Sequence, residues 1–261
     1  LQNKALTLGS GTSDMTVTGA VTFDNSSSQI LTGGADLSLQ SSSGFDLVNG
    51  KLSSTGGTLS LPYGMVLGGG AIFDFSGSTA ELSGALNVGA GTITSDNGSV
   101  LELQAASSFS SNAVFTIPKL ELNSQALTLN TSSTHLTLSN PFSVGASESV
   151  DTQAGSLTLN GLATLEDNGT IESSAGSLTF NGSVALDNAS LLLTGGSVAL
   201  NSGAAISGGE LQLFDSSLTL GANVGMTNDS TLGLRNTTIN PGSYTIGMTG
   251  GTLGLGGTYS D

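Results

Sequence analysis

The acidic residues are the first candidates for chemistry, because catalysis or calcium binding on a repetitive fold needs carboxylates that lie close together. The best-spaced group combines Glu166 and Asp167 with Asp187, about one repeat later. Aspartate is also a common turn residue, and Ser207 and Gly208 occupy the corresponding place in the next repeat. We therefore predict neither catalytic residues nor a metal site.

Basic and imidazole side chains are scarce. The one histidine is His135 and the one arginine is Arg235, and both are expected to point outward from a strand or corner, far from each other. A polysaccharide hydrolase or lyase needs an acid, a base and a cation in one cluster, which these residues cannot supply. The sequence also lacks a nucleotide-binding loop, a zinc-type spacing and an EF-hand pattern, so we predict no cofactor and no enzymatic activity.

One set of hydroxyl side chains is spaced regularly. A column of threonines is broken by Ala199 and resumes at Thr219, and a row of serines lies two residues upstream of it. A flat hydroxyl array on a rigid surface is a candidate face for binding ice or a crystalline polysaccharide. Threonine also suits exposed strand positions and stabilises neighbouring strands, and we favour this simpler interpretation. The column is Thr94, Thr116, Thr137, Thr158 and Thr179, and the serines are Ser156, Ser177, Ser197 and Ser217.

The positions of these residues depend on an internal repeat of about 21 residues. The sequence GSLTLNG runs from Gly155 to Gly161, and GSLTFNG follows 21 residues later, from Gly176 to Gly182. A row of apolar residues recurs at steps of 20 to 22 residues, and we predict that it forms one inward column. The row is Leu52, Ile72, Ile93, Phe115, Leu136, Leu157, Leu178, Val198, Leu218 and Ile239.

Each repeat usually contains three short apolar–x–apolar packets, the pattern of a strand with one buried face. Antiparallel hairpins would explain single pairs of packets, but not the recurrence of every third packet over ten turns. We therefore predict an all-β fold, a single parallel β-helix (β-solenoid) of about twelve coils with three short strands each. The solenoid is expected to form one continuous domain over residues 1–261.

Asparagines recur at two corners of the predicted coil. Asparagine tolerates the left-handed conformation that sharp corners need, and stacked asparagine side chains can bond from coil to coil as ladders. Asparagine also simply suits turns, but the regular spacing favours ladders. The first corner holds Asn160, Asn181 and Asn201, and the second holds Asn168, Asn188 and Asn228.

The N-terminal half follows the pattern less closely. The segment from Ala71 to Phe75 (AIFDF) leaves the inward face ambiguous between two alternating sets of residues. Residues 104–113 are rich in serine and alanine and are expected to form a widened turn. Neither interruption has the length or composition of a linker between domains.

Composition excludes several classes of partner. Nineteen acidic against four basic residues give a formal charge of −15, whereas nucleic acids and anionic membrane surfaces attract positive charge. No apolar run is long enough for membrane insertion. The chain has no cysteine, and it begins at Leu1 without a signal-like segment. We expect a mature piece or fragment of a longer surface protein.

The coil length, the three-strand pattern, the GSLTLNG-type motif and the shortage of basic residues together resemble bacterial haemagglutinin-like adhesins and autotransporter passenger repeats. Two tetrapeptides, Gly69–Ile72 (GGAI) and Phe109–Asn112 (FSSN), also look like those of polymorphic outer-membrane autotransporters, but each occurs once here. The resemblance implies export to the bacterial outer surface, display as an elongated shaft, and adhesion or filament formation.

We therefore expect a structural or adhesive extracellular protein. The alternatives are a carbohydrate-binding or carbohydrate-active β-helix and an ice-binding face, but the chain has no tryptophan and only Tyr63, Tyr244 and Tyr259 to build an aromatic groove. Both ends, Ala5–Leu8 and Gly251–Gly257, keep the strand pattern, with Asp261 the only charge near the C-terminal end. We expect these edges to pair with further coils or with other copies head to tail. A cell-surface or matrix glycan is a second candidate partner.

Overall fold

The computed structural model describes residues 4–9, 14–21, 23, 25–42, 44–112 and 114–256. These residues form strands and no helix, and so none of them belongs to a helix with the length and hydrophobicity of a membrane span. The chain divides into two compact units, Leu1–Leu127 (unit 1) and Thr128–Asp261 (unit 2), each with parallel strands stacked coil on coil. The predicted fold class, an all-β parallel β-solenoid, is confirmed, whereas the single continuous domain stays a prediction.

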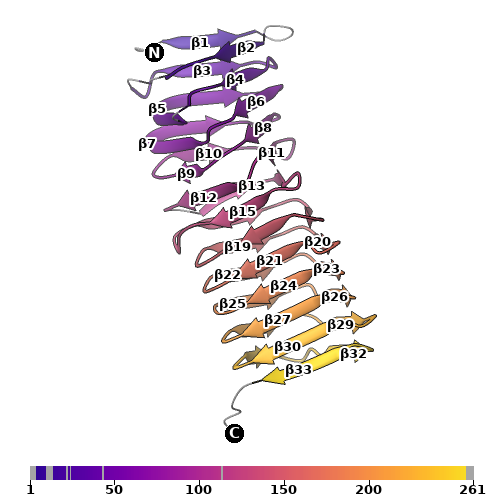
Figure 1. Ribbon diagram of the computed structural model, residues 1–261. Helices are drawn as coiled ribbons and strands as arrows, with labels where there is room; N and C mark the ends of the chain where they lie inside the picture. Colours follow the sequence, from indigo (N-terminus) through magenta and orange to yellow (C-terminus); the bar gives the residue numbers. More distant parts are fainter. Residues whose placement is uncertain are drawn as a thin grey trace. The chain divides into compact units, whose positions relative to one another are not determined.

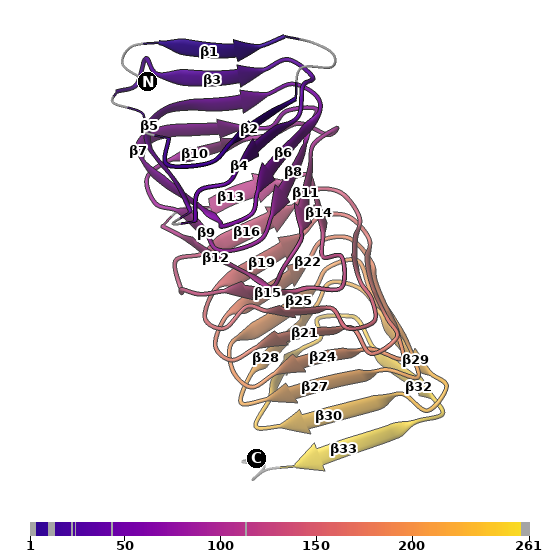
Figure 2. The ribbon, with the colours of Figure 1, turned by 45° about the horizontal axis from the view of Figure 1, so that its top comes forward.

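Unit 2 has the predicted three-sided coil. Its described strands make six coils, and each coil contributes one strand to each of three parallel sheets (Figure 1). The sheet orders are β18-β21-β24-β27-β30-β33, β16-β19-β22-β25-β28-β31 and β17-β20-β23-β26-β29-β32. The first of these sheets is seen as a regular stack in Figure 2. The strands are β16 (His135–Leu138), β17 (Phe142–Val144), β18 (Ser149–Asp151), β19 (Ser156–Leu159), β20 (Ala163–Glu166), β21 (Thr170–Ser173), β22 (Ser177–Phe180), β23 (Val184–Asp187), β24 (Ser190–Leu193), β25 (Ser197–Leu200), β26 (Ala204–Ser207), β27 (Glu210–Phe214), β28 (Ser217–Leu220), β29 (Val224–Thr227), β30 (Thr231–Arg235), β31 (Thr238–Asn240), β32 (Ile246–Thr249) and β33 (Thr252–Gly256).

The described strands of unit 1 also make six coils, but two of these strands are ten residues long. The strand β7 pairs with β9 through its first part and with β10 through its last part, so it passes a corner without a break. Its sheets follow β1-β3-β5-β7-β9-β12, with β10 beside β7, and β2-β4-β6-β8-β11-β14. The strands are β1 (Ala5–Leu8), β2 (Met15–Val17), β3 (Gln29–Thr32), β4 (Leu37–Leu39), β5 (Phe45–Ser54), β6 (Thr58–Leu61), β7 (Met65–Asp74), β8 (Thr79–Leu82), β9 (Leu86–Val88), β10 (Thr92–Thr94), β11 (Val100–Leu103), β12 (Ser107–Ser111), β13 (Val114–Ile117), β14 (Lys119–Glu121) and β15 (Ala126–Leu129), which contains the unit boundary.

The apolar column of unit 2 lies in exact strand register. Leu136 is opposite Leu157, Leu157 opposite Leu178, Leu178 opposite Val198, and Val198 opposite Leu218. All five side chains are buried. Each side chain therefore packs between equivalent side chains of the coils before and after it, which is how a repeat too small to hold a core of its own becomes stable.

The inward column of unit 1 differs from the predicted row at one residue. Leu52 lies opposite Phe73, and Phe73 lies opposite Ile93, so the expectation that Ile72 faces inward is wrong. The side chain of Ile72 is 39% exposed and that of Phe73 is 1% exposed. A register shift between Leu47 and Asn49 sets the phase of this strand pair, and the Phe73 ring stacks on Phe75 with centroids 5.1 Å apart.

The serine- and alanine-rich segment 104–113 is not the widened turn that its composition suggests. Ser107, Phe109 and Ser111 are the buried residues of β12, and β12 pairs with β9. The Phe109 ring lies 6.0 Å from that of Phe115. Alternation of inward and outward side chains, rather than apolar character, defines this strand, because small serines can fill inward positions beside a large ring.

Replacing Leu178 by Asp is expected to destabilise the protein by about 3 kcal/mol or more, because the carboxylate would be buried without a partner. Thr179, which is opposite Thr158 and points outward, provides the control. Thr179→Asp is expected to cost about 1 kcal/mol or less. Urea denaturation followed by circular dichroism measures both, and equal losses in the two variants would contradict the inward register.

Candidate functional site

The carboxylates with the best spacing lie on a corner of unit 2 without forming a cluster. Glu166 is opposite Asp187, and Asp187 is opposite Ser207, so the acidic pair ends after one coil. All the acids at this corner are exposed, and Asp167 adopts a left-handed turn conformation with φ of 52°. Among the described residues no group of three or more His, Cys, Asp or Glu could hold a metal ion.

His135 and Arg235 lie apart, on different coils of unit 2. His135 opens β16, is half-buried, and lies opposite Ser156 at the top of the serine row. The Arg235 guanidinium is exposed, lies 3.4 Å from the Asp215 carboxylate, and sits 4.8 Å from the centre of the Phe214 ring. Its contact with Asp215 ties two neighbouring coils together, and among the described residues Asp215 is the acid with which it forms an ion pair.

The hydroxyl columns share one outward face of unit 2. Thr137, Thr158 and Thr179 lie opposite one another, with Ala199 next in line. The serines of the parallel row lie opposite one another as well, and the Ser177 hydroxyl donates to that of Ser156 at 2.8 Å. Thr94 and Thr116 are exposed residues of β10 and β13 in unit 1, where Thr94 lies opposite Asp74.

The first asparagine corner is a side-chain ladder. The Asn181 amide nitrogen donates to Asn160 Oδ1 at 2.8 Å, and the Asn201 amide nitrogen donates to Asn181 Oδ1 at 2.8 Å. None of these three residues has a positive φ. The amides therefore serve as links between coils here and not as left-handed turn residues.

The asparagines at the second corner serve as left-handed turn residues. Asn168, Asn188 and Asn228 have φ values of 71°, 51° and 52°, so each supplies the left-handed conformation of a sharp turn. Their side chains form no continuous ladder: that of Asn188 donates to Asp187, and that of Asn228 donates to Ser207. Between them stands Gly208, with φ of 65°, where a Cβ would overlap the amide oxygen of Asn188.

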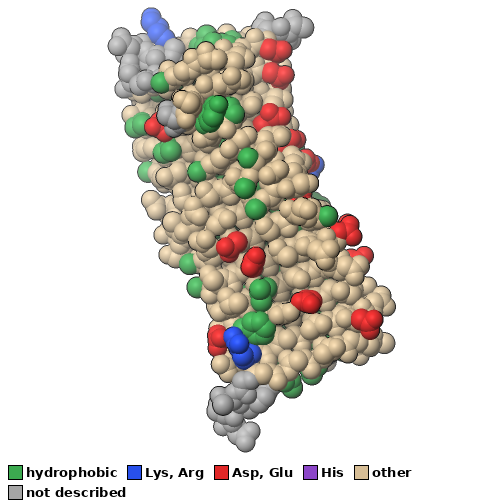
Figure 3. All heavy atoms as spheres, viewed as in Figure 1, with side chains coloured by type: hydrophobic (Ala, Val, Ile, Leu, Met, Phe, Trp, Pro, Cys, Tyr) green, Lys and Arg blue, Asp and Glu red, His purple; other side chains and the backbone are tan. Residues whose placement is uncertain are grey.

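An acidic surface in unit 1 is a feature that the sequence analysis missed. Glu81, Glu102 and Glu121 lie opposite one another on β8, β11 and β14. In Figure 3, carboxylates follow one another along the side of unit 1 on which these strands lie. The signal was available, because these glutamates recur at about the repeat length in the outward position of a strand.

Glu102, the middle member of this row, has a raised pKa. Burial raises the pKa of its carboxyl, and the charges of Glu121 and Glu81 raise it further. A hydrogen bond from Asn123 and the charge of Lys119 act in the opposite direction. The Lys119 ammonium is 2.5 Å from Glu121, so the only cation near the row among the described residues is already paired with its neighbour.

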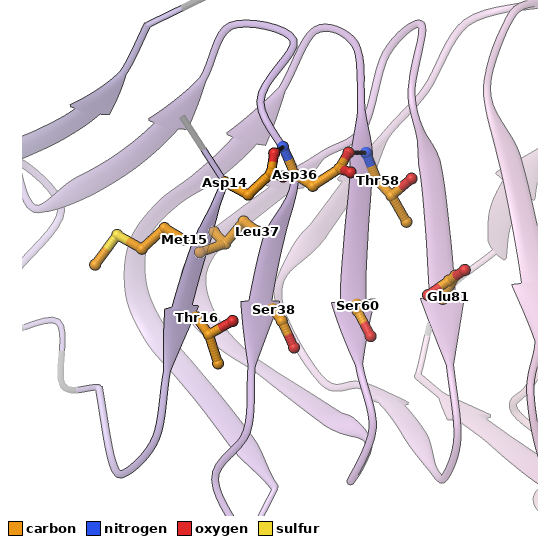
Figure 4. A pocket seen from close by; sticks show the side chains of 9 residues that line it. All are labelled: Asp14, Met15, Thr16, Asp36, Leu37, Ser38, Thr58, Ser60 and Glu81. Carbon is orange, nitrogen blue, oxygen red and sulfur yellow. Dashed lines mark hydrogen bonds between the residues drawn. The ribbon is translucent and has the colours of Figure 1, made fainter. Parts of the chain in front are cut away.

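Two further carboxylates line a shallow groove on the same face. Figure 4 shows Asp14, Asp36 and Thr58 in one row, and Thr16, Ser38, Ser60 and Glu81 in a second row. The backbone N–H of Asp36 donates to Asp14, and that of Thr58 donates to Asp36 at 2.6 Å. These carboxylates thus accept hydrogen bonds from the next coil, which is a structural task.

No protein-family model matches the chain, and neither a curated protein nor a solved structure is significantly similar to it.

Replacing Glu102 by Gln is expected to stabilise the protein at pH 7. Because its folded pKa is raised, the stability that protonated Glu102 contributes is present below its ordinary value of 4.5 and is lost as the pH rises. The gain of the variant should therefore vanish at pH 4. In the otherwise unchanged chain, Lys119→Gln should make the stability depend more strongly on pH, because the charge of Lys119 lowers the pKa of Glu102. Thermal melts at both pH values measure this, and an equal gain at pH 4 and pH 7 would contradict it.

Removing links of the asparagine ladder is expected to destabilise in proportion to the hydrogen bonds lost. Asn160→Ala removes one ladder bond and should cost about 0.5 kcal/mol, whereas Asn181→Ala removes two and should cost about 1 kcal/mol. Chemical denaturation compares the two variants. A larger effect from Asn160→Ala would show that the ladder is not the source of the stability.

Proposed function

We propose that this chain is a structural module of an extracellular bacterial surface protein, a β-solenoid shaft that provides reach and contact for adhesion or filament formation. It is not an enzyme in this proposal. The resemblance to haemagglutinin-like adhesins and autotransporter passenger repeats supports it, as does the strongly acidic composition, which disfavours nucleic acids and anionic membranes as partners.

The observation that carries the proposal is the apolar edge of unit 2 at β33. Leu253 and Leu255 continue the inward row of Leu232 and Leu234, but they are 51% and 56% exposed. In the described residues β33 pairs with β30 on one side and is the last strand of its sheet. An open strand edge with apolar inward residues is a template for another coil.

The occupant of this edge in the proposal is a further coil, either of the same polypeptide or of a second copy of the chain. Head-to-tail addition of copies does not close on itself, so it lengthens the shaft into a filament. Such addition suits mechanical reach, because each added coil extends the stack by about one strand spacing, roughly 4.8 Å.

The carbohydrate-binding alternative has less support. Tyr63 is an exposed turn residue of unit 1, and Tyr244 is an exposed residue of the segment before β32 in unit 2. Tyr259 lies outside the described residues. A sugar-binding groove generally depends on several aromatic side chains that converge on one site.

A chain of residues 1–261 is expected to associate as its concentration increases, and the variant Leu253→Glu with Leu255→Glu is expected to stay monomeric, because charges would occupy the apolar edge. Thr252→Glu, at a neighbouring position of the same strand, is the control and should associate like the parent. Light scattering and electron microscopy measure the size. A parent chain that stays monomeric at high concentration, with protected amides in both terminal coils, would overturn the proposal.

A further inference from the structure

Carboxylates supply part of the side-chain links between the coils of unit 1. Asp14 accepts from the Asp36 N–H at 3.4 Å, and Asp36 accepts from the Thr58 N–H at 2.6 Å. Asp74 accepts from the Ser53 hydroxyl at 3.1 Å and pairs with Lys51 at 2.9 Å, and Asp96 accepts from the Gly77 N–H at 2.9 Å. Each of these four acids bridges a different pair of successive coils, from the first coil to the fifth.

The side-chain links between the coils of unit 2 come mainly from neutral amides and hydroxyls. Asn181 donates to Asn160, and Asn201 donates to Asn181. At the next coil boundary the Asn228 amide donates to the Ser207 hydroxyl. At the one after it, the Thr245 N–H donates to the Asn223 side-chain oxygen. The exception is Asp215, which accepts from Asn236 at 2.9 Å in addition to its contact with Arg235. The Asp215 side chain is 53% exposed, and those of Asp14, Asp36 and Asp96 in unit 1 are exposed as well, whereas that of Asp74 is 14% exposed. Among the described residues the two units therefore differ in how many carboxylates link their coils, and not in the exposure of those carboxylates.

We propose that acid acts selectively on the two units: it loosens the coil-to-coil links of residues 1–127 and leaves those of residues 128–261 intact. A carboxylate accepts a hydrogen bond strongly when ionised and weakly when protonated. A carboxamide keeps its donor and acceptor at every pH of interest. Hydroxyl links such as Thr32 to Ser54 and Ser78 to Ser54 hold the unit 1 coils together in part and do not titrate.

The electrostatics of two bridging acids agree with this geometry. Hydrogen bonds from Gly77 and Ser99 lower the pKa of Asp96, with burial and the charge of Asp74 opposing them. Burial raises the pKa of Asp74, but hydrogen bonds from Lys51, Ser76 and Ser53 outweigh it and leave the pKa lowered. A lowered folded pKa means stability that is present above the ordinary value of 3.8 and is lost as the pH falls through the folded value.

Acidification has the opposite effect at Glu102: it adds stability, and it does so at a higher pH. The groups facing it are Glu81 on β8 and Glu121 and Lys119 on β14, and its pKa is raised. Acidification from pH 7 to about 4.5 therefore relieves repulsion in unit 1, and acidification below 3.8 weakens the links that Asp74 and Asp96 make. Unit 1 is expected to reach its greatest stability between these two ranges.

Hydrogen exchange of the full chain, read by mass spectrometry and normalised for the intrinsic rate at each pH, tests the proposal. Between pH 4.5 and pH 2.5, peptides that contain Gly77 are expected to lose protection by about tenfold, as befits the loss of a hydrogen bond to a charged group. Peptides that contain Asn181 and Asn201 are expected to change by less than threefold. Equal losses in both units, a greater loss in unit 2, or no loss in unit 1 would each overturn the proposal.

Two matched variants test whether the acid-induced loss of protection comes from the carboxylate links. Asp96→Asn keeps the acceptor oxygen that takes the bonds of Gly77, Gly98 and Ser99, and should remove the acid-induced loss at the Gly77 peptide. Asn181→Asp replaces the amide that donates to Asn160, so unit 2 should lose protection at pH 7 and regain it on acidification, when the protonated acid can donate. An unchanged acid response in Asp96→Asn, or a loss that acid deepens in Asn181→Asp, would contradict the assignment.

Discussion

A coil of about 21 residues cannot bury its own apolar side chains, and the remaining structure follows from this constraint. Leu157 of unit 2 is buried because Leu136 and Leu178 lie directly above and below it in register. The column exists only as a stack, and a stack of identical contacts requires parallel strands with no slip between coils. Where the stack has no next coil in the described residues, at Leu253 and Leu255, the same apolar positions are exposed.

The two units meet the same packing requirement with different polar chemistry. In unit 1, acids such as Asp36 and Asp96 accept hydrogen bonds from the adjoining coil, and the row of Glu81, Glu102 and Glu121 introduces repulsion on one face. In unit 2, amides and hydroxyls provide the corresponding links. Core packing alone gives both units the same fold, so the charge content of the links is what distinguishes their response to solvent.

The outward positions are free of the packing constraint, and so they are where a surface protein would carry its contacts. The hydroxyl face of unit 2 carries no acidic or basic side chain in its Ser and Thr rows and is regular in register, whereas the glutamate face of unit 1 is negative. The same parallel coil thus presents different chemistry to solvent in the two units. The acids Glu166 and Asp187 of unit 2 lie opposite each other and are exposed.

The sequence by itself determined the repeat, the parallel stacking and the inward column of unit 2, because apolar residues that alternate and recur at one spacing can be buried together in only one register. The sequence also shows the glycine that opens the GSLTFNG motif. The structure gives a reason for it, because a Cβ at Gly176 would overlap the carbonyl oxygen of Gly155 in the coil before it. Only the tertiary structure decided between Ile72 and Phe73, since both are apolar and a one-residue shift in strand phase exchanges the two faces. It also decided which asparagines link coils and which bend the chain, because the same residue type serves both tasks and its φ is set by the neighbouring coil. The tertiary structure also created the acidic face, because stacking places Glu81 and Glu121 beside Glu102, where burial and their charges raise its pKa.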